Sequence, residues 1–240
     1  MPYDPTPTWG QLYGVIGTFA TNNVKAAASL LHSEGQAQLA DADERAPAWA
    51  TLGAPTGGET KVWWCAYFDS KDAYHVGHKQ AQNKESRQSF LPRMRDLLLT
   101  GDMMQDMRGG FMGPLLHLEN PAGKGEAAFA LLNIVTGLSV EAAERIVEIQ
   151  KAQSTLSVQA SRGKCLRVTI AGPQGDHPGG DTATAVYILE QWTSEPDYES
   201  FVVMPGRVPT PSPGVVPLVS NMKMDAKVLT FAKSMKHYKR

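Results

Sequence analysis

The sequence predicts an α+β fold built from two tandem copies of one β-α-β-β-α-β unit. Apolar runs of strand length alternate with helical periodicity in the same order in both halves of the 240 residues. Short segments also repeat in matching places, and a Pro- and Gly-containing stretch at 121–126 separates the two halves. This element order is that of the ferredoxin-like unit, an antiparallel sheet with helices on one face.

The first half contains four predicted strands and three predicted helices. Aromatic and β-branched residues favour strands, and Ser70 stands where its side chain can cap a helix. The strands are expected at 12–21, 48–54, 61–68 and 108–120, and the helices at 24–46, 70–82 and 86–101.

The second half repeats this order. Ser139 and Ser194 each precede a helical pattern as N-caps, and a proline follows Ser194 inside the first turn. The strands are expected at 128–137, 164–172, 182–192 and 218–224, and the helices at 138–153, 194–203 and 225–240.

Three pairs of segments support a duplication. FDSKDAY (68–74) matches WTSEPDY (192–198), and VKAA and PLLHLEN in the first half match VEAA and PLVSNMK in the second. The offset between partners changes only where loops intervene, as loop insertions require. We therefore predict two domains, 1–121 and 126–240. Their sheets would pack face to face as an α/β barrel within one chain.

Composition and charge argue against several classes of function. The net charge is −1, which leaves no basic field for nucleic acid, and no apolar run is long enough to cross a bilayer. The N-terminus shows no secretion signal, and Cys65 and Cys165 form neither a disulfide framework nor a metal motif. We expect a cytoplasmic protein without a metal site. Its oligomeric state stays open, with a homodimer as one alternative.

The segment YILEQWTSEPDYESF (187–201) resembles the strand-to-helix segment of the antibiotic biosynthesis monooxygenase superfamily. There a strand ends in Glu-x-Trp and a Ser opens a helix, as Glu190, Trp192 and Ser194 do here. The first half has Ala66 and Phe68 in place of the Glu and Trp. The resemblance implies a dimeric α/β barrel fold. It also implies a cofactor-free oxygenase of polycyclic phenols, or a relative that binds haem, isomerises or cyclises.

Polar residues inside apolar runs are the first site candidates, because their burial costs free energy unless they have a partner. Asn133 in ALLNIV could stabilise an oxyanion through its amide. His117 in PLLHLE and His32 in SLLHSE could act as a base near neutral pH. Each could equally be a hydrogen-bonded core residue.

Aromatic residues are the second group. In the strand WWCAYF, Trp63 and Tyr67 share one face and Trp64 lies on the other. With His75 and Trp192 they could bind a flat ligand, or the tryptophans could simply fill the core. Three arginines, Arg87, Arg93 and Arg95, could clamp an acidic substrate or form a solvated helix face.

We expect a tailoring enzyme of secondary metabolism that oxygenates a phenolic or polyketide-like substrate through a deprotonated anion, without a cofactor. His117 or His32 would be the base and Asn133 the anion stabiliser. The partner would be a small aromatic molecule. A cyclase or isomerase, a haem-binding protein and a non-catalytic barrel protein are the alternatives.

Overall fold

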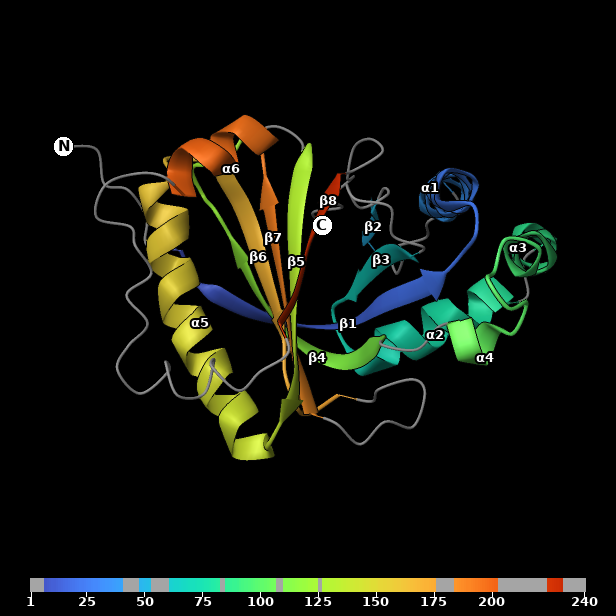
Figure 1. Ribbon diagram of the computed structural model, residues 1–240, viewed down its shortest axis with the longest axis horizontal. Coiled ribbons are helices and arrows are strands. Elements are labelled where there is room, and N and C mark those ends of the chain that lie inside the picture. The colour runs from blue at the N-terminus through green and yellow to red at the C-terminus, as the bar shows by residue number, and fades with distance from the viewer. Residues whose placement is uncertain are drawn as a thin grey trace. The chain divides into compact units, whose positions relative to one another are not determined.

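The structure, a computed structural model, describes residues 7–40, 48–52, 61–82, 85–106, 110–124, 127–175, 184–202 and 224–230. It has a mixed α+β fold with antiparallel strand pairing (Figure 1). The contacts divide the chain into two compact units. The N-terminal unit comprises Gln11–Pro114, Gly175–Asp181 and Leu229–Arg240, and the C-terminal unit comprises Met1–Gly10, Leu115–Gln174 and Thr182–Val228.

The N-terminal unit contains a sheet in the order β2-β3-β1. All three strands pair antiparallel, so that Cys65 of β3 lies between Ile16 of β1 and Ala50 of β2. The elements are β1 (Trp9–Ala20), α1 (Val24–Ala40), β2 (Ala48–Leu52), β3 (Lys61–Phe68), α2 (Lys71–Gln82), α3 (Glu85–Arg95) and α4 (Met103–Asp106). The predicted strand 61–68 and the Ser70 cap of α2 are confirmed, since Ser70 Oγ accepts from Ala73 N at 3.1 Å.

One face of this sheet packs against α1 and α3. Phe19 of β1 and Val62 of β3 are buried in a cluster with Leu31 of α1 and Met94 of α3. Because strand neighbours point to opposite faces, the set that contains Val62, Ala66 and Phe68 belongs to the helix side. The sequence left open which set of β3 meets the helices, and the structure assigns it.

The chain after α3 differs from the prediction of a helix over 86–101. The helix ends at Arg95, although the following Leu97-Leu98-Leu99 run is apolar. Leu99 N donates instead to Ala20 O at 3.1 Å, and Leu98 forms a bridge with Thr21. Apolar periodicity alone could not distinguish the two, because a run of three leucines fits a helix or an extended segment, and here Leu98 is the one that is buried.

The C-terminal unit contains a sheet in the order β4-β6-β7-β5, with β8 beside β5. The elements are β4 (Phe111–Glu119, of which 115–119 belong to this unit), β5 (Phe129–Leu138), α5 (Val140–Ala160), β6 (Cys165–Ala171), β7 (Thr184–Trp192), α6 (Glu195–Val202) and β8 (Met224–Thr230). Ser139 caps α5, as predicted, by accepting from Ala142 N at 3.2 Å. Ser194 caps α6 by accepting from Asp197 N.

Helix α5, yellow in Figure 1, runs along one face of this sheet. Its Ala143, Ile146 and Val158 are buried with Val168 of β6 and Ile188 of β7. The helix is longer than the predicted 138–153. The Ser- and Thr-rich end has a modest helix propensity, but Ser154, Ser157 and Val158 are buried, and packing can override propensity.

The last strand was predicted at 218–224 and the tail from 225 as a helix. The helix prediction is wrong over 225–230, because β8 covers Met224–Thr230, and of the predicted strand only Met224 is described, inside β8. Over 224–228 apolar and polar residues alternate, a period of two that fits a strand. Residues 218–223 and 231–240 lie outside the described part.

The connection after β4 is fixed by hydrogen bonds of the Asn120 side chain. Asn120 is buried, and its Nδ2 donates to Cys165 O at 2.7 Å and Val158 O at 3.1 Å, while its Oδ1 accepts from Ala122 N. Gly163 has φ +87, and a Cβ there would lie 2.7 Å from Ala122 O. The predicted linker therefore begins as a packed turn against the end of α5.

The two repeated segments have equivalent local structures, each inside its own unit. In the N-terminal unit, Phe68 pairs with Tyr13 in register, and Tyr74 of α2 contacts Phe68 at 5.1 Å between ring centroids. In the C-terminal unit, Trp192 pairs with Phe129, and Tyr198 of α6 contacts Trp192 at 5.5 Å. The interplanar angles are 81° and 72°. The segment match thus reflects one recurring strand, cap and helix arrangement.

None of the helices in the described ranges combines the length and the apolar character that crossing a bilayer requires.

Candidate functional site

A row of polar side chains lies on one face of the sheet in the C-terminal unit. Leu118, Val168 and Ile188 point to the α5 side, so the residues that alternate with them lie on the other face. The strand register pairs the members of this set directly. We call the set the polar sheet face, and it consists of His117, Glu119, Arg167, Thr169 and Gln191.

His117 is the residue of the polar sheet face that could serve as a base. It is 9% exposed, and its Nδ1 lies 3.0 Å from Thr169 Oγ1 of the neighbouring strand. Its Nε2 lies 3.9 Å from Glu119 Oε1, beyond hydrogen-bond length but close enough for charge attraction. When Nδ1 carries the proton and donates to Thr169, Nε2 presents a lone pair. The ring is then oriented so that Nε2 can accept a proton, with the Glu119 carboxylate nearby.

Arg167 and Gln191 form the second part of the polar sheet face. Arg167 Nη1 donates to Gln191 Oε1 at 3.0 Å. Because a guanidinium can only donate, this bond fixes which end of the amide is oxygen. Gln191 is fully buried, and its Nε2 has no hydrogen-bond partner among the residues that the structure describes.

Apolar and aromatic side chains surround this polar row. Leu132 and Leu189 are fully buried in the register row of His117. Tyr187 lies one row further along β7, and burial raises the pKa of its hydroxyl to about 12. Tyr187 therefore stays protonated and neutral at physiological pH. The face combines an apolar floor with a few oriented polar groups, which is typical of small-molecule sites.

Of the three predicted catalytic residues, only His117 lies on the polar sheet face. Asn133 of β5 pairs in register with Ile188, so its backbone position belongs to the α5 side of the sheet. His32 lies in α1, in the other unit. The structure thus does not place the proposed anion stabiliser on the same sheet face as the proposed base.

The predicted substrate-binding residues lie in different parts of the two units. Trp192 is fully buried on the helix side, where it packs against Tyr198 and Phe201, and its Nε1 donates to Glu190 Oε2 at 3.3 Å. Its surroundings are those of a core residue. His75 is exposed on α2 beside Tyr74.

In β3 the register separates the two tryptophans. Trp64 occupies a position on the α1 side, whereas Trp63 shares the opposite face with Cys65 and Tyr67. Tyr67 is buried. Burial raises the pKa of the Cys65 thiol to about 12, and a hydrogen bond with the Tyr67 side chain lowers it in part. This makes Cys65 an inert core thiol, as expected from its sequence context.

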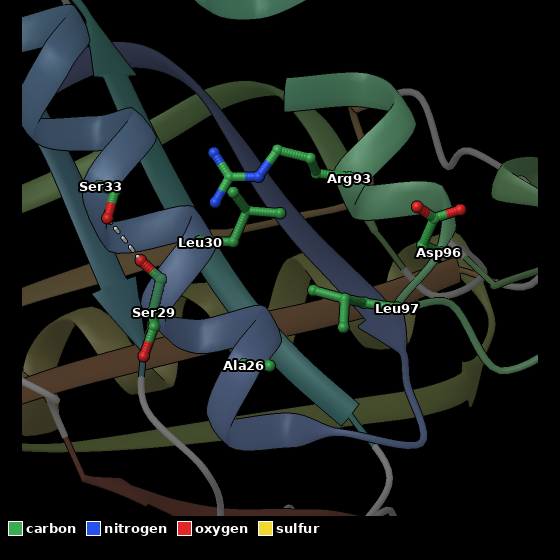
Figure 2. Close-up of a pocket in the computed structure, with 7 residues that line it drawn as sticks. All are labelled: Ala26, Ser29, Leu30, Ser33, Arg93, Asp96 and Leu97. Atoms are coloured by element: carbon green, nitrogen blue, oxygen red, sulfur yellow. Dashed lines mark hydrogen bonds between the residues drawn. The ribbon is translucent and has the colours of Figure 1, made fainter. Parts of the chain in front are cut away.

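A shallow groove of about 440 Å³ lies between α1 and α3 in the N-terminal unit (Figure 2). Arg93 reaches from α3 toward Leu30 and Ser33 of α1, and Ser33 Oγ donates to Ser29 O. The groove is lined by Ala26, Ser29, Leu30, Ser33, Arg93, Asp96 and Leu97. Arg93 and Asp96 are both exposed. None of the predicted catalytic or substrate-binding residues lines it.

Within the described ranges, no three His, Cys, Asp or Glu side chains gather closely enough to hold a metal ion. The polar sheet face itself offers one imidazole and one carboxylate.

Sequence reasoning missed Arg167, Thr169 and Gln191. The signal was present, because each is a polar residue inside an apolar strand, the same criterion that selected His117 and Asn133. What the sequence did not provide was the register between β4, β6 and β7, which brings these residues into adjoining rows.

Comparison with known proteins gives a fold but no family. No protein-family model matches the chain, and no curated protein matches its sequence. Two solved structures named "putative monooxygenase" share the fold. The protein from Lactobacillus acidophilus NCFM has a TM-score of 0.55 at 13% identity, covering 92% of this chain and 93% of that one. The protein from Fusobacterium nucleatum subsp. nucleatum has 0.58 at 10%, covering 96% and 98%.

An anthrone oxidase-like protein has a TM-score of 0.56 at 10% identity and covers 94% of each chain. At such identities the likeness establishes the fold alone. The chain therefore has the α+β fold of these proteins over nearly its whole length, and its chemistry must be argued from its own residues.

Proposed function

We propose that the chain is a small-molecule oxygenase of the antibiotic biosynthesis monooxygenase superfamily. It would oxygenate a planar phenolic or polyketide-like substrate without a cofactor. The observation that carries this proposal is His117, a buried imidazole that lies 3.0 Å from Thr169 Oγ1, faces Glu119 and shares its sheet face with the buried Leu132 and Leu189. The names of the structural neighbours, which include an anthrone oxidase-like protein, agree with this chemistry.

The proposed chemistry needs one base. His117 Nε2 takes a proton from a phenol or an activated CH₂ group, and the product is an electron-rich anion. Glu119 stabilises the imidazolium, and the apolar floor keeps water from the anion. For a CH₂ group, the anion gives four electrons to O₂. One oxygen atom becomes the new carbonyl, and the other leaves as water with the two substrate hydrogens.

The proposed architecture is a tandem repeat of ferredoxin-like units, with domains at 1–121 and 126–240. The matching aromatic contacts of Tyr74 and Tyr198 support this repeat. So does the strand order within each unit, because β2-β3-β1 and β6-β7-β5 are the same order in successive copies.

The proposal is tested by oxygen uptake with anthrone as substrate. We expect the wild-type protein to consume one O₂ per anthrone and to form anthraquinone, and we expect no conversion under argon. His117→Gln should lower the rate by roughly 100-fold or more, because it removes the base. Glu148→Gln, an exposed change on α5, is the control and should keep the wild-type rate.

Three other results of these experiments would refute the role of His117 or favour an alternative function. Full activity in His117→Gln, with folding verified by circular dichroism, would refute the role of His117. Conversion that persists under argon would indicate the cyclase or isomerase alternative. A protein purified with the strong absorption band of haem would indicate the haem-binding alternative.

A further inference from the structure

The buried side-chain amide of Gln191 has a hydrogen bond at its oxygen but, within the part of the chain that the structure describes, none at its nitrogen. Its oxygen accepts from Arg167 Nη1, yet its Nε2 has no partner among the described residues although the side chain is 0% exposed. Buried polar groups in native proteins are nearly always hydrogen-bonded, so an orphan donor requires an explanation. A ligand with an acceptor oxygen provides one.

Arg167 makes Gln191 a stronger donor than an ordinary amide. A cation that donates to the amide oxygen draws electron density from the nitrogen, so the N–H groups become more positive. Charge-assisted networks of this kind favour strong acceptors such as carbonyl and phenolate oxygens. Arg167 is half-buried, so its charge acts through a partly desolvated surrounding.

The strand order sets the separation between Gln191 and His117. They lie on β7 and β4, with β6 between them, and on the same sheet face. Gln191 lies two residues along β7 from Leu189, which shares the register row of His117, so two interstrand spacings and this offset separate the two Cα atoms by about 12 Å. Both residues lie on the same sheet face, and a hydrogen bond of about 3 Å at each end leaves room for one carbonyl-bearing ring between them.

We propose that Gln191 is a substrate-binding residue whose side-chain N–H donates to a carbonyl or phenolate oxygen across one ring from the group that His117 deprotonates. This inference rests on the proposed function and defines its substrate class. The substrate carries an acceptor oxygen and an acidic C–H or O–H group on opposite sides of the same ring. As that proton leaves, negative charge moves onto the distal oxygen, where the Gln191 donor stabilises it.

The test compares the binding of two probes of nearly equal shape. Anthrone carries the acceptor oxygen, and 9,10-dihydroanthracene lacks it. Dissociation constants would be measured by quenching of tryptophan fluorescence, without turnover, under argon. We expect the wild-type protein to bind anthrone about tenfold more tightly than dihydroanthracene, which is the value of one buried hydrogen bond.

Two variants of Gln191 isolate the donor, and a third variant is the control. Gln191→Leu removes the amide, and Gln191→Glu keeps an oxygen for Arg167 but removes the donor; both should abolish the preference for anthrone. Gln150→Leu is the matched control, because Gln150 bonds Ser154 on α5 away from the polar sheet face. It should keep the wild-type preference. Circular dichroism would establish that each variant is folded.

The outcomes separate this inference from the proposed function. If both Gln191 variants keep the preference for anthrone, the role of Gln191 is refuted, while oxygen uptake dependent on His117 can stand. If the preference depends on Gln191 but no oxygen is consumed, the donor role holds and the oxygenase proposal fails. A wild-type protein that binds neither probe, or both equally, overturns the inference.

Discussion

Asp197 accepts hydrogen bonds from three side chains at the start of α6. Lys164 Nζ donates at 2.8 Å and Ser194 Oγ at 2.9 Å, and Thr193 Oγ1 also donates to it. Chiefly because of Lys164, and then Thr193, the pKa of the Asp197 carboxyl is lowered from 3.8 to about 2. Asp197 thus links the start of α6 to Lys164, in addition to the helix cap that Ser194 provides.

This shift predicts a pH-dependent stability. The carboxylate is charged in both states above about pH 5, so its contribution is fully present there. Below 3.8 the unfolded chain takes up the proton first, and the contribution is lost as pH falls toward 2. We expect Asp197→Asn to cost about 1 kcal/mol at pH 6, after allowance for solvent screening, and much less near pH 2.

Urea denaturation at a series of pH values measures this difference. Glu148→Gln, on the exposed surface of α5, serves as the control and should give no such pH-dependent difference. A difference between Asp197→Asn and the wild type that stays constant from pH 6 to pH 2 would contradict this role of Asp197.

At the scale of elements, the turn after β4 is hydrogen-bonded to the end of α5 and to the start of β6. Asn120 satisfies the carbonyls of Val158 and Cys165 together with the amide of Ala122. Removal of the Asn120 side chain takes this partner from Cys165 O and Ala122 N, whereas Val158 O keeps a hydrogen bond from Ser161 Oγ.

We expect Asn120→Ala to lower the free energy of unfolding by about 2–4 kcal/mol. Asn120→Asp should also destabilise, because an ionised carboxylate cannot donate to the two carbonyls. Chemical denaturation measures both changes. Lys124→Ala, an exposed change in the same connection, should have little effect. An Asn120→Ala protein as stable as the wild type would show that the network contributes nothing.

Sequence patterns identified most of these elements, for physical reasons that differ between them. The strands around Cys65 and Ile188 were predictable because they are continuous apolar runs, and the caps at Ser139 and Ser194 because cap chemistry is local. The end of α3 and the length of α5 were not, because both depend on packing against residues distant in sequence. For the same reason the sequence identified His117 but not its neighbours Thr169, Arg167 and Gln191.

On the scale of the whole molecule, the compact units are not the same as the sequence halves. Residues 115–119 of β4 pair with β6 and belong to the C-terminal unit, although they precede the predicted boundary at 121. Leu118 is fully buried in the core of that unit. The two predicted domains remain a prediction about how the sequence was duplicated. The contacts define two units, each of which is compact by itself.

A fragment test follows from this arrangement. We expect a fragment of residues 110–240 to keep more cooperative structure than one of residues 126–240. The shorter fragment loses Leu118 from the core and Asn120 from the turn, and it exposes the edge of β6. Thermal unfolding followed by circular dichroism compares them. Equal stability of the two fragments would contradict the contribution of β4.

The N-terminal end of β1 has a consequence for the order of folding. Trp9 Nε1 donates to Thr155 Oγ1 at 3.0 Å, and the Trp9 ring packs on the core of the unit that contains α5. In a nascent chain, the Trp9 indole cannot form these contacts until α5 has been synthesised. Folding during translation therefore cannot finish in strict N-to-C order, because Trp9 completes a core whose other residues are made much later.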